Sequence, residues 1–316
     1  MNTAPSHAFH FHPRVTFADT NVVGNVYYLN FFRWQKEALD TWLQSEHPSV
    51  WSGLGRGHLR LLFTRWSCRF EDPFGATLGD SISVALDCEM EPECDSRVAA
   101  TADRLVRGES LSVRAETCRD SEVNMARLTT GAWICRIVSN CSTIETTPLD
   151  DGEDGACYRM RVTSPIDRDL NALDLLAWQG TCRELFLEDH APGILHAVAT
   201  HQLILQTTNA SIEWPGHLPP RGHSIDVEMR LQALKCGQMG VRFDYRCDAI
   251  HRLAPFAVGL QSMSSKHPVG ESIAPCPLPT ELVLALRTYT DSPRLRAKIE
   301  DILRFAESES AVAVPR

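Results

Sequence analysis

One turn of the chain carries the residues best suited to chemistry. In the stretch TFADTNVVGNVYYLNFFRWQ, residues 16–35, Asn21 comes shortly before Gly24, Asn25 and Val26, and a run rich in aromatic residues follows. An amide cannot abstract a proton at neutral pH, so Asn21 can only orient water or donate a hydrogen bond. If a helix begins after this turn, its free N–H groups and its dipole favour negative charge on a nearby oxygen. The spacing therefore predicts a site that acts by positioning and electrostatics, in which Gly24 allows close approach to the backbone.

A structural interpretation of the same residues stands beside this one. An Asn-Gly turn before a helix commonly acts only as a turn and a cap. Tyr28 and Phe31 suit the lining of a core or of a pocket better than a catalytic role. Arg65 alternates with Arg69 on one face of a predicted strand, which fits a solvated face as well as a binding surface.

Periodicity predicts the elements that position this turn. Phe9, Phe11, Val15 and Phe17 fall on odd positions, which predicts a strand with one buried face. Apolar residues spaced by three or four predict a helix over 28–46. The other expected elements of the first half are strands at 59–70, 80–91, 97–106 and 127–138. The second half repeats this order, with a strand at 157–163, a helix at 173–189, strands at 202–214, 223–234, 238–248 and 255–264, and helical structure over 279–308 broken near Ser292-Pro293.

The two halves are related as a tandem duplication. Trp34-Gln35 recurs 144 residues later as Trp178-Gln179. An offset of 143 then pairs further residues: His58 with His201, Thr64 with Thr207, Gly79 with Gly222, Ser81 with Ser224 and Ile82 with Ile225. The sequence therefore predicts a domain at 1–142, an acidic linker at 143–156 and a second domain at 157–316. One helix and an antiparallel sheet in each domain predict an α+β fold.

Composition excludes several classes of protein. With 316 residues, 43% hydrophobic and 22% charged, the chain is long enough for two ordinary cores. No apolar run is long enough to span a bilayer, and a net charge of −9 argues against general binding to nucleic acid or anionic membrane. The eleven cysteines are scattered without metal-ligand spacing. We expect a cytoplasmic protein with reduced cysteines, no signal peptide and no metal site.

Two segments carry a resemblance to a known family. DTNVVGNVYYLNFFRWQ in the first half, with WQGTCRELFLEDHAP in the second, resembles the hotdog-fold thioesterases associated with enediyne polyketide synthases. These form a branch of the 4-hydroxybenzoyl-CoA-type thioesterase family. The resemblance implies a double hotdog, in which two helix-wrapped antiparallel sheets form an intramolecular pseudo-dimer that can assemble further into a homo-oligomer. It also implies no cofactor and an acyl thioester carried by an acyl carrier protein or by coenzyme A.

The same resemblance assigns roles to individual residues. In the broader family the position of Asn21 is an aspartate, whereas the enediyne branch carries asparagine. Two further functional positions, a tyrosine and an arginine, fall on Phe31 and Leu39 in the first half. In the second half the asparagine, glycine, tyrosine and arginine positions fall on Pro165, Arg168, Leu175 and Arg183.

Neither half alone holds a full set, so we expect one composite site at the interface of the halves, with Arg183 serving the site begun by Asn21. Independent drift of two unrelated positions is the alternative. The expected site comprises Asn21 and Arg183 as catalytic residues, Gly24, Asn25 and Val26 as the oxyanion turn, and Tyr28, Phe31 and Arg65 as substrate-binding residues.

These assignments predict hydrolysis of a polyketide or fatty acyl thioester in specialised metabolism. Two alternatives remain open. A hotdog cyclase or dehydratase would act on a carrier-bound chain without net hydrolysis, although the chain lacks the H-x-x-x-G-x-x-x-x-P element of the hotdog dehydratases. A degenerate relative would bind acyl chains or partner a synthase.

Overall fold

The computed structural model describes ten segments of the chain, which are residues 8–20, 26–72, 75–92, 109–120, 126–139, 156–214, 219–250, 254–269, 272–290 and 292–312. The chain divides into two compact units. The first holds Met1–Thr147, Asn171–Leu173 and Ser211–His217, and the second holds Pro148–Leu170, Asp174–Ala210 and Leu218–Arg316.

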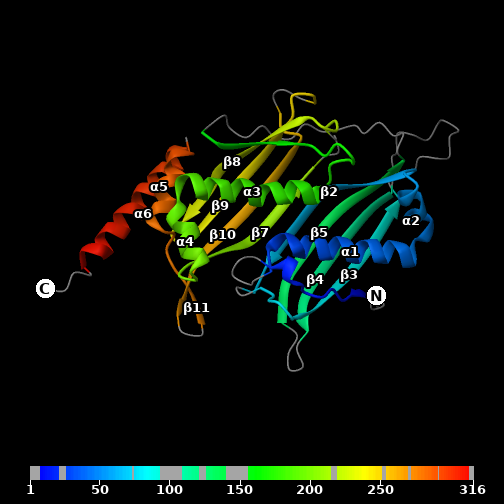
Figure 1. Ribbon diagram of the computed structural model, residues 1–316, viewed down its shortest axis with the longest axis horizontal. Helices are drawn as coiled ribbons and strands as arrows, with labels where there is room; N and C mark the ends of the chain where they lie inside the picture. The colour runs from blue at the N-terminus through cyan, green and yellow to red at the C-terminus, as the bar shows by residue number, and fades with distance from the viewer. Residues whose placement is uncertain are drawn as a thin grey trace, which may run out of the picture. The chain divides into compact units, whose positions relative to one another are not determined.

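The first unit is an antiparallel sheet with a long helix, α1, against one face (Figure 1). Its strands lie in the order β1 (Phe9–Phe11), β3 (Ser81–Pro92), β4 (Glu109–Asp120), β5 (Ala126–Ser139) and β2 (Leu59–Phe70). Its helices are the short 3₁₀ turn η1 (Phe17–Asp19), α1 (Tyr28–Glu46) and α2 (Pro48–Gly55). Phe31, Trp34 and Ala38 are buried on the side of α1 that meets the sheet, as their spacing predicts.

The strands of the first unit alternate between a helix-facing and an outer side. On β4, Leu111, Val113 and Ala115 are buried, whereas Ser112 and Arg114 between them are exposed. The ladder of β2 and β5 is irregular between Phe63 and Arg65, where the register shifts by one residue. Beyond this irregularity Trp66 faces α1 and Arg65 faces the outer side.

The second unit repeats this architecture. Its strands lie in the order β7 (Ile204–Glu213), β10 (Ala257–Val269), β9 (Gln238–Arg246), β8 (Ser224–Lys235) and β6 (Tyr158–Thr163), and β11 (Ser272–Pro275) pairs with β10. Its helices are α3 (Ala172–His190), α4 (Pro192–Ala199), α5 (Thr280–Thr288) and α6 (Pro293–Val312). The interval between α5 and α6 confirms the break expected near Pro293. None of the helices that the structure describes has the length and apolarity needed to cross a bilayer.

The α+β architecture predicted for each half is confirmed, with some corrections. The strand predicted at 97–106 lies outside the described residues, and β4 at Glu109–Asp120 was not predicted. Phe17 was expected on a buried strand face, but it lies in η1 with 83% of its surface exposed. Helices α2 and α4 were not predicted. Of the predicted linker, residues 143–155 lie outside the described part of the chain, and the pairing of the halves as a pseudo-dimer stays a prediction.

Candidate functional site

The start of α1 is held by the buried carboxylate of Asp19, which ends the short 3₁₀ turn η1 upstream of the helix. Asp19 Oδ2 accepts hydrogen bonds from the backbone N–H and the hydroxyl of Thr16, each 2.7 Å long, and Asp19 forms an ion pair with Arg33 of α1. The Asp19 carbonyl accepts from the Tyr27 amide at 3.0 Å and from Asn30 Nδ2 at 2.6 Å. The segments on both sides of residues 21–25 are therefore held to the first turns of the helix.

These contacts explain the protonation state of Asp19. Burial opposes ionisation of this carboxyl group, but the hydrogen bonds from Thr16 and the Arg33 guanidinium outweigh it and hold its pKa below the ordinary value. Asp19 is thus ionised at neutral pH and fully engaged in tying the turn to the helix. Such a carboxylate serves as a structural anchor.

Three of the predicted site residues, Asn21, Gly24 and Asn25, lie outside the described residues. The residues that flank them, Thr20 and Val26, form an antiparallel bridge. The Val26 amide, predicted as an oxyanion donor, instead donates to the carbonyl of Ala76 at 2.7 Å. Because a backbone N–H has one hydrogen to donate, this contact speaks against an oxyanion role for Val26 in this conformation.

Tyr28 and Phe31, predicted as substrate-binding residues, lie together in an aromatic cluster. Both rings meet the ring of Phe70 on β2 edge to face, at centroid distances of 6.2 Å and 5.7 Å. Both side chains are buried. The cluster continues along the sheet through Phe32 and Trp66, whose rings are 5.2 Å apart. These aromatic side chains form the apolar interior beside the helix start.

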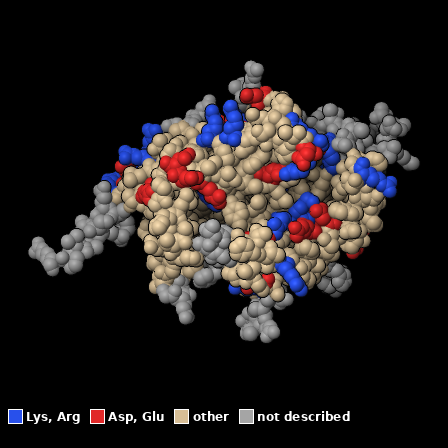
Figure 2. Space-filling model, viewed as in Figure 1, with Lys and Arg blue, Asp and Glu red and all other residues tan. Residues whose placement is uncertain are grey.

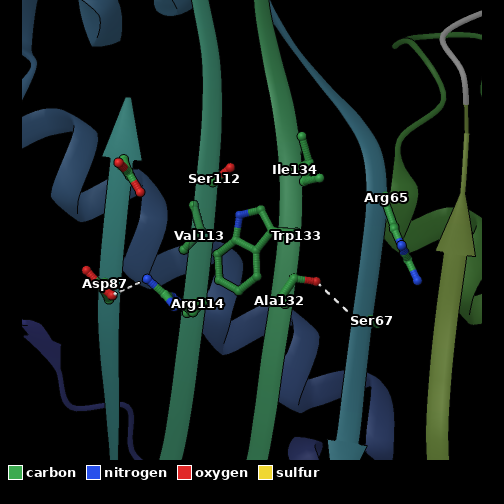
Figure 3. A pocket seen from close by; sticks show the side chains of 10 residues that line it. Arg65, Ser67, Asp87, Ser112, Val113, Arg114, Ala132, Trp133 and Ile134 are labelled. Carbon is green, nitrogen blue, oxygen red and sulfur yellow. Dashed lines mark hydrogen bonds and ion pairs between the residues drawn. The ribbon is translucent and has the colours of Figure 1, made fainter. Parts of the chain in front are cut away.

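The structure separates Arg65 from these two residues. Arg65 lies on the outer face of the sheet, opposite α1, where it lines a hollow of about 480 Å³ (Figure 3). On the floor of this hollow the Ser67 hydroxyl donates to the Ala132 carbonyl at 3.3 Å, and Arg114 forms an ion pair of 3.2 Å with Asp87. The sheet lies between Arg65 on one face and Tyr28 and Phe31 on the other. The three residues therefore do not form the single substrate-binding group that was predicted.

Arg183 occupies the interface of α3 with the sheet of the second unit. Its side chain is only 12% exposed. Its Nη1 atom donates to Thr207 Oγ1 at 3.1 Å and to Gln261 Oε1 at 3.2 Å, and it lies 3.7 Å from Met263 Sδ. A guanidinium held in this way is a strong, fixed donor to oxygen.

The repeated Trp-Gln dipeptide has a packing role that the sequence alone did not predict. Gln35 is fully buried; its Oε1 accepts from Trp66 Nε1 at 3.2 Å, and its Nε2 lies 3.6 Å from Cys68 Sγ. A Cβ placed on Gly131 of β5 would lie 2.7 Å from both amide atoms of Gln35. In the second unit a Cβ on Gly259 of β10 would lie 2.1 Å from Gln179 Nε2. In each half a helix glutamine thus packs directly on a strand glycine. The repeat of the Trp-Gln dipeptide was the feature of the sequence that could have indicated this contact.

Charges on the helices are balanced locally. Figure 2 shows several places on the displayed face where Lys or Arg lies beside Asp or Glu, together with groups of a single sign. Lys36 and Asp40 of α1 form an ion pair of 2.5 Å, and Arg168 pairs with Asp174 at 2.6 Å near the start of α3. Among the described residues no group of His, Cys, Asp and Glu side chains could hold a metal ion.

Solved structures share this arrangement. Over 82% of its length the chain is similar to a 12:0-ACP thioesterase from Umbellularia californica, with a TM-score of 0.54, 11% identity and 94% of that chain covered. A protein described as an oleoyl thioesterase from Lactobacillus plantarum gives the same TM-score with 10% identity, covering 84% of this chain and 99% of that one. The chain has a double hotdog fold. At these identities the likeness shows the fold alone.

A further similarity covers one half of the double hotdog. The dynemicin thioesterase is 29% identical over 42% of this chain and 96% of its own, with a TM-score of 0.39. No protein-family model matches the sequence, and no curated protein matches it closely enough to count as a relative.

Proposed function

We propose that this double hotdog protein hydrolyses an acyl thioester, with a polyketide or fatty acyl chain carried by an acyl carrier protein or coenzyme A, in specialised metabolism. The observation that carries the proposal is the firmly held start of α1, which adjoins the Asn21 turn within a fold shared with acyl-ACP thioesterases. The buried aromatic cluster of Tyr28, Phe31 and Phe70 beside it suits an apolar chain.

The proposed chemistry needs no acyl-enzyme intermediate. A water molecule oriented by the Asn21 amide attacks the thioester carbon, and the new C–O bond forms as negative charge gathers on the carbonyl oxygen. The C–S bond then breaks, and the thiol leaves with the proton that water has lost. Asn21 orients and donates but does not take the proton. Arg183 supplies a fixed cationic donor for a substrate oxygen.

The test measures how the full chain hydrolyses a panel of acyl-carrier-protein and acyl-CoA thioesters. Thiol release gives the rate, and the product mass identifies the product. We expect release of the free acid, and a loss of about 10²–10³ in kcat for Asn21→Ala, as for removal of one oxyanion donor. A product with the mass of a cyclised or dehydrated chain still on its carrier would replace hydrolysis with the corresponding reaction. Full activity of Asn21→Ala on every cleaved thioester would refute the assignment of Asn21.

A further inference from the structure

Helix α3 presents two polar side chains to its own sheet. Gln179 and Arg183 lie four residues apart, which places them on the same helix face. Gln179 is fully buried above Gly259, and Arg183 reaches Thr207 on β7 and Gln261 on β10. A polar stripe at a helix–sheet interface is costly unless its donors and acceptors are used.

The hydrogen bond from Arg183 fixes the orientation of the Gln261 amide. Arginine has only donors, so the atom of Gln261 that faces it must be the oxygen. The amide nitrogen Nε2 then points elsewhere, and among the described residues it has no hydrogen-bond acceptor. Gln261 is 1% exposed. A buried donor of this kind calls for an acceptor, because an unsatisfied buried polar group is strongly unfavourable.

The matching positions of the first unit carry neither a cation nor an amide, although the buried indole N–H of Trp133 also has no acceptor among the described residues. Leu39 stands four residues after Gln35, as Arg183 stands four after Gln179. Trp133 stands two residues after Gly131, as Gln261 stands two after Gly259. Both units therefore keep the glutamine on its glycine, but beyond it the first unit places leucine and tryptophan and the second places arginine and glutamine.

We propose that Arg183 and Gln261 of the second unit form a paired-donor subsite for a ligand oxygen, a carbonyl or a carboxylate, that lies in the acyl chain apart from its thioester. Thr207, whose hydroxyl accepts from Arg183, keeps one hydrogen to donate to the same oxygen. The identity of the ligand as an acyl chain rests on the proposed function. Gln261 is then a specificity-determining residue that favours oxygenated chains over saturated ones.

Binding tests the subsite without relying on catalysis. Three chains of equal length, one saturated, one with an internal ketone and one with a terminal carboxylate, are joined to pantetheine through an amide in place of the thioester. Calorimetry with the full chain should show at least one oxygenated ligand binding about tenfold or more tighter than the saturated one, as a charge-assisted hydrogen bond provides. Equal affinity for all three ligands would overturn the proposal and would indicate that Gln261 Nε2 donates to a water molecule.

Two substitutions at one position separate recognition from structure. Gln261→Glu keeps an oxygen for Arg183 but removes the Nε2 donor, so it should abolish the preference for the oxygenated chain while the protein stays folded. Gln261→Met removes both groups and should abolish it too. If Gln261→Glu keeps the preference, Gln261 only orients Arg183 and the proposal fails.

Gln35→Met is the matched control, since it removes an equally buried amide from the first unit. It should leave the ratio of affinities unchanged, and a loss of the ratio in this variant would also count against the subsite. The outcomes remain distinct from those for the proposed function. If the protein cleaves no thioester but binds the oxygenated amide preferentially, the subsite proposal stands and the proposed thioesterase activity fails. If it cleaves all chains at equal rates and binds them with equal affinities, the thioesterase activity stands and the subsite proposal fails.

Discussion

Asp19 stabilises the segment before α1 through the contacts of its carboxylate. Its carboxylate accepts from Thr16 and pairs with Arg33, and its pKa lies below the ordinary value despite burial. A carboxyl group with a lowered folded-state pKa contributes stability that is fully present above its unfolded pKa of about 3.9. This contribution is lost as the pH falls through the lower folded value.

Asp19→Asn should therefore destabilise the protein by about 1–3 kcal/mol at pH 7, because it weakens bonds to a buried charged acceptor. The difference from the wild type should shrink as the pH is lowered below about 4, because the wild type then loses the Asp19 charge, which the variant lacks at every pH. Urea unfolding between pH 3 and 7 measures this. The control is Asp40→Asn, which breaks the more exposed pair with Lys36 and should cost about 0.5 kcal/mol. A constant difference across this pH range would contradict the role of the charge.

Arg65 is expected to have no part in binding the acyl chain. Its side chain lies on the outer face of the sheet, while Tyr28 and Phe31 are buried on the helix side. Arg65→Ala should leave kcat/KM for an acyl-CoA thioester unchanged within about twofold, since surface substitutions away from a site have small effects. Phe31→Ala, which opens the buried cluster, should lower it much more. An equal loss of kcat/KM in both variants would support the prediction that Arg65 binds substrate together with Tyr28 and Phe31.

The sequence predicted the start of α1 better than it predicted the donors around it. The start of α1 lies where local patterns placed it, whereas residues 21–25 lie outside the described part of the chain. The contact of the Val26 amide could not be foreseen, since its acceptor, Ala76, is fifty residues away along the chain. The direction of Arg65 depended on the register shift between Phe63 and Arg65, which no local pattern announces.

Among the elements, the glutamine–glycine contacts set how closely helix and sheet approach. Gly131→Ala should destabilise the protein by about 1–3 kcal/mol, because its methyl group would overlap the amide of Gln35, which is fully buried and held by Trp66. Thermal unfolding measures the loss. Gln35→Ala added to Gly131→Ala should recover part of it, and additive losses in the double variant would show that the two residues do not share a contact.

Elements with strong periodicity were predicted well and short ones were not. The helix over 28–46 and the strand over 59–70 match α1 and β2. Helices α2 and α4 each begin at a proline, Pro48 and Pro192, and proline favours the first helical turn as much as it ends a helix. Strand β4 does alternate, with Leu111, Val113 and Ala115 between polar residues, but the strand predicted for this part of the chain was placed at 97–106 and did not include it.

At the scale of the whole molecule, the two halves share a scaffold and differ in their interiors. The proposal that Asn21 and Arg183 serve one reaction links residues from different halves, and kinetics can test it. Asn21→Ala and Arg183→Met should each lower kcat/KM, and the double variant should lose close to the product of the two single losses, because Asn21 acts at the thioester and Arg183 on an oxygen elsewhere in the chain. Hydrolysis of the best oxygenated thioester substrate is the measurement. A combined loss much smaller than the product would assign both residues to the reacting group and would contradict the separate subsite.

Both halves keep a helix glutamine packed on a strand glycine, but next to it one half has Leu39 and the other has Arg183. This difference has a genetic consequence. When two identical subunits come from one gene, every substitution enters both at once, and a change that helps one pocket is imposed on its twin. Here each half has its own codons. A mutation can therefore change the polarity of one interior while the other keeps its aromatic lining, and an engineer could retune the chain selectivity of one half without altering the other.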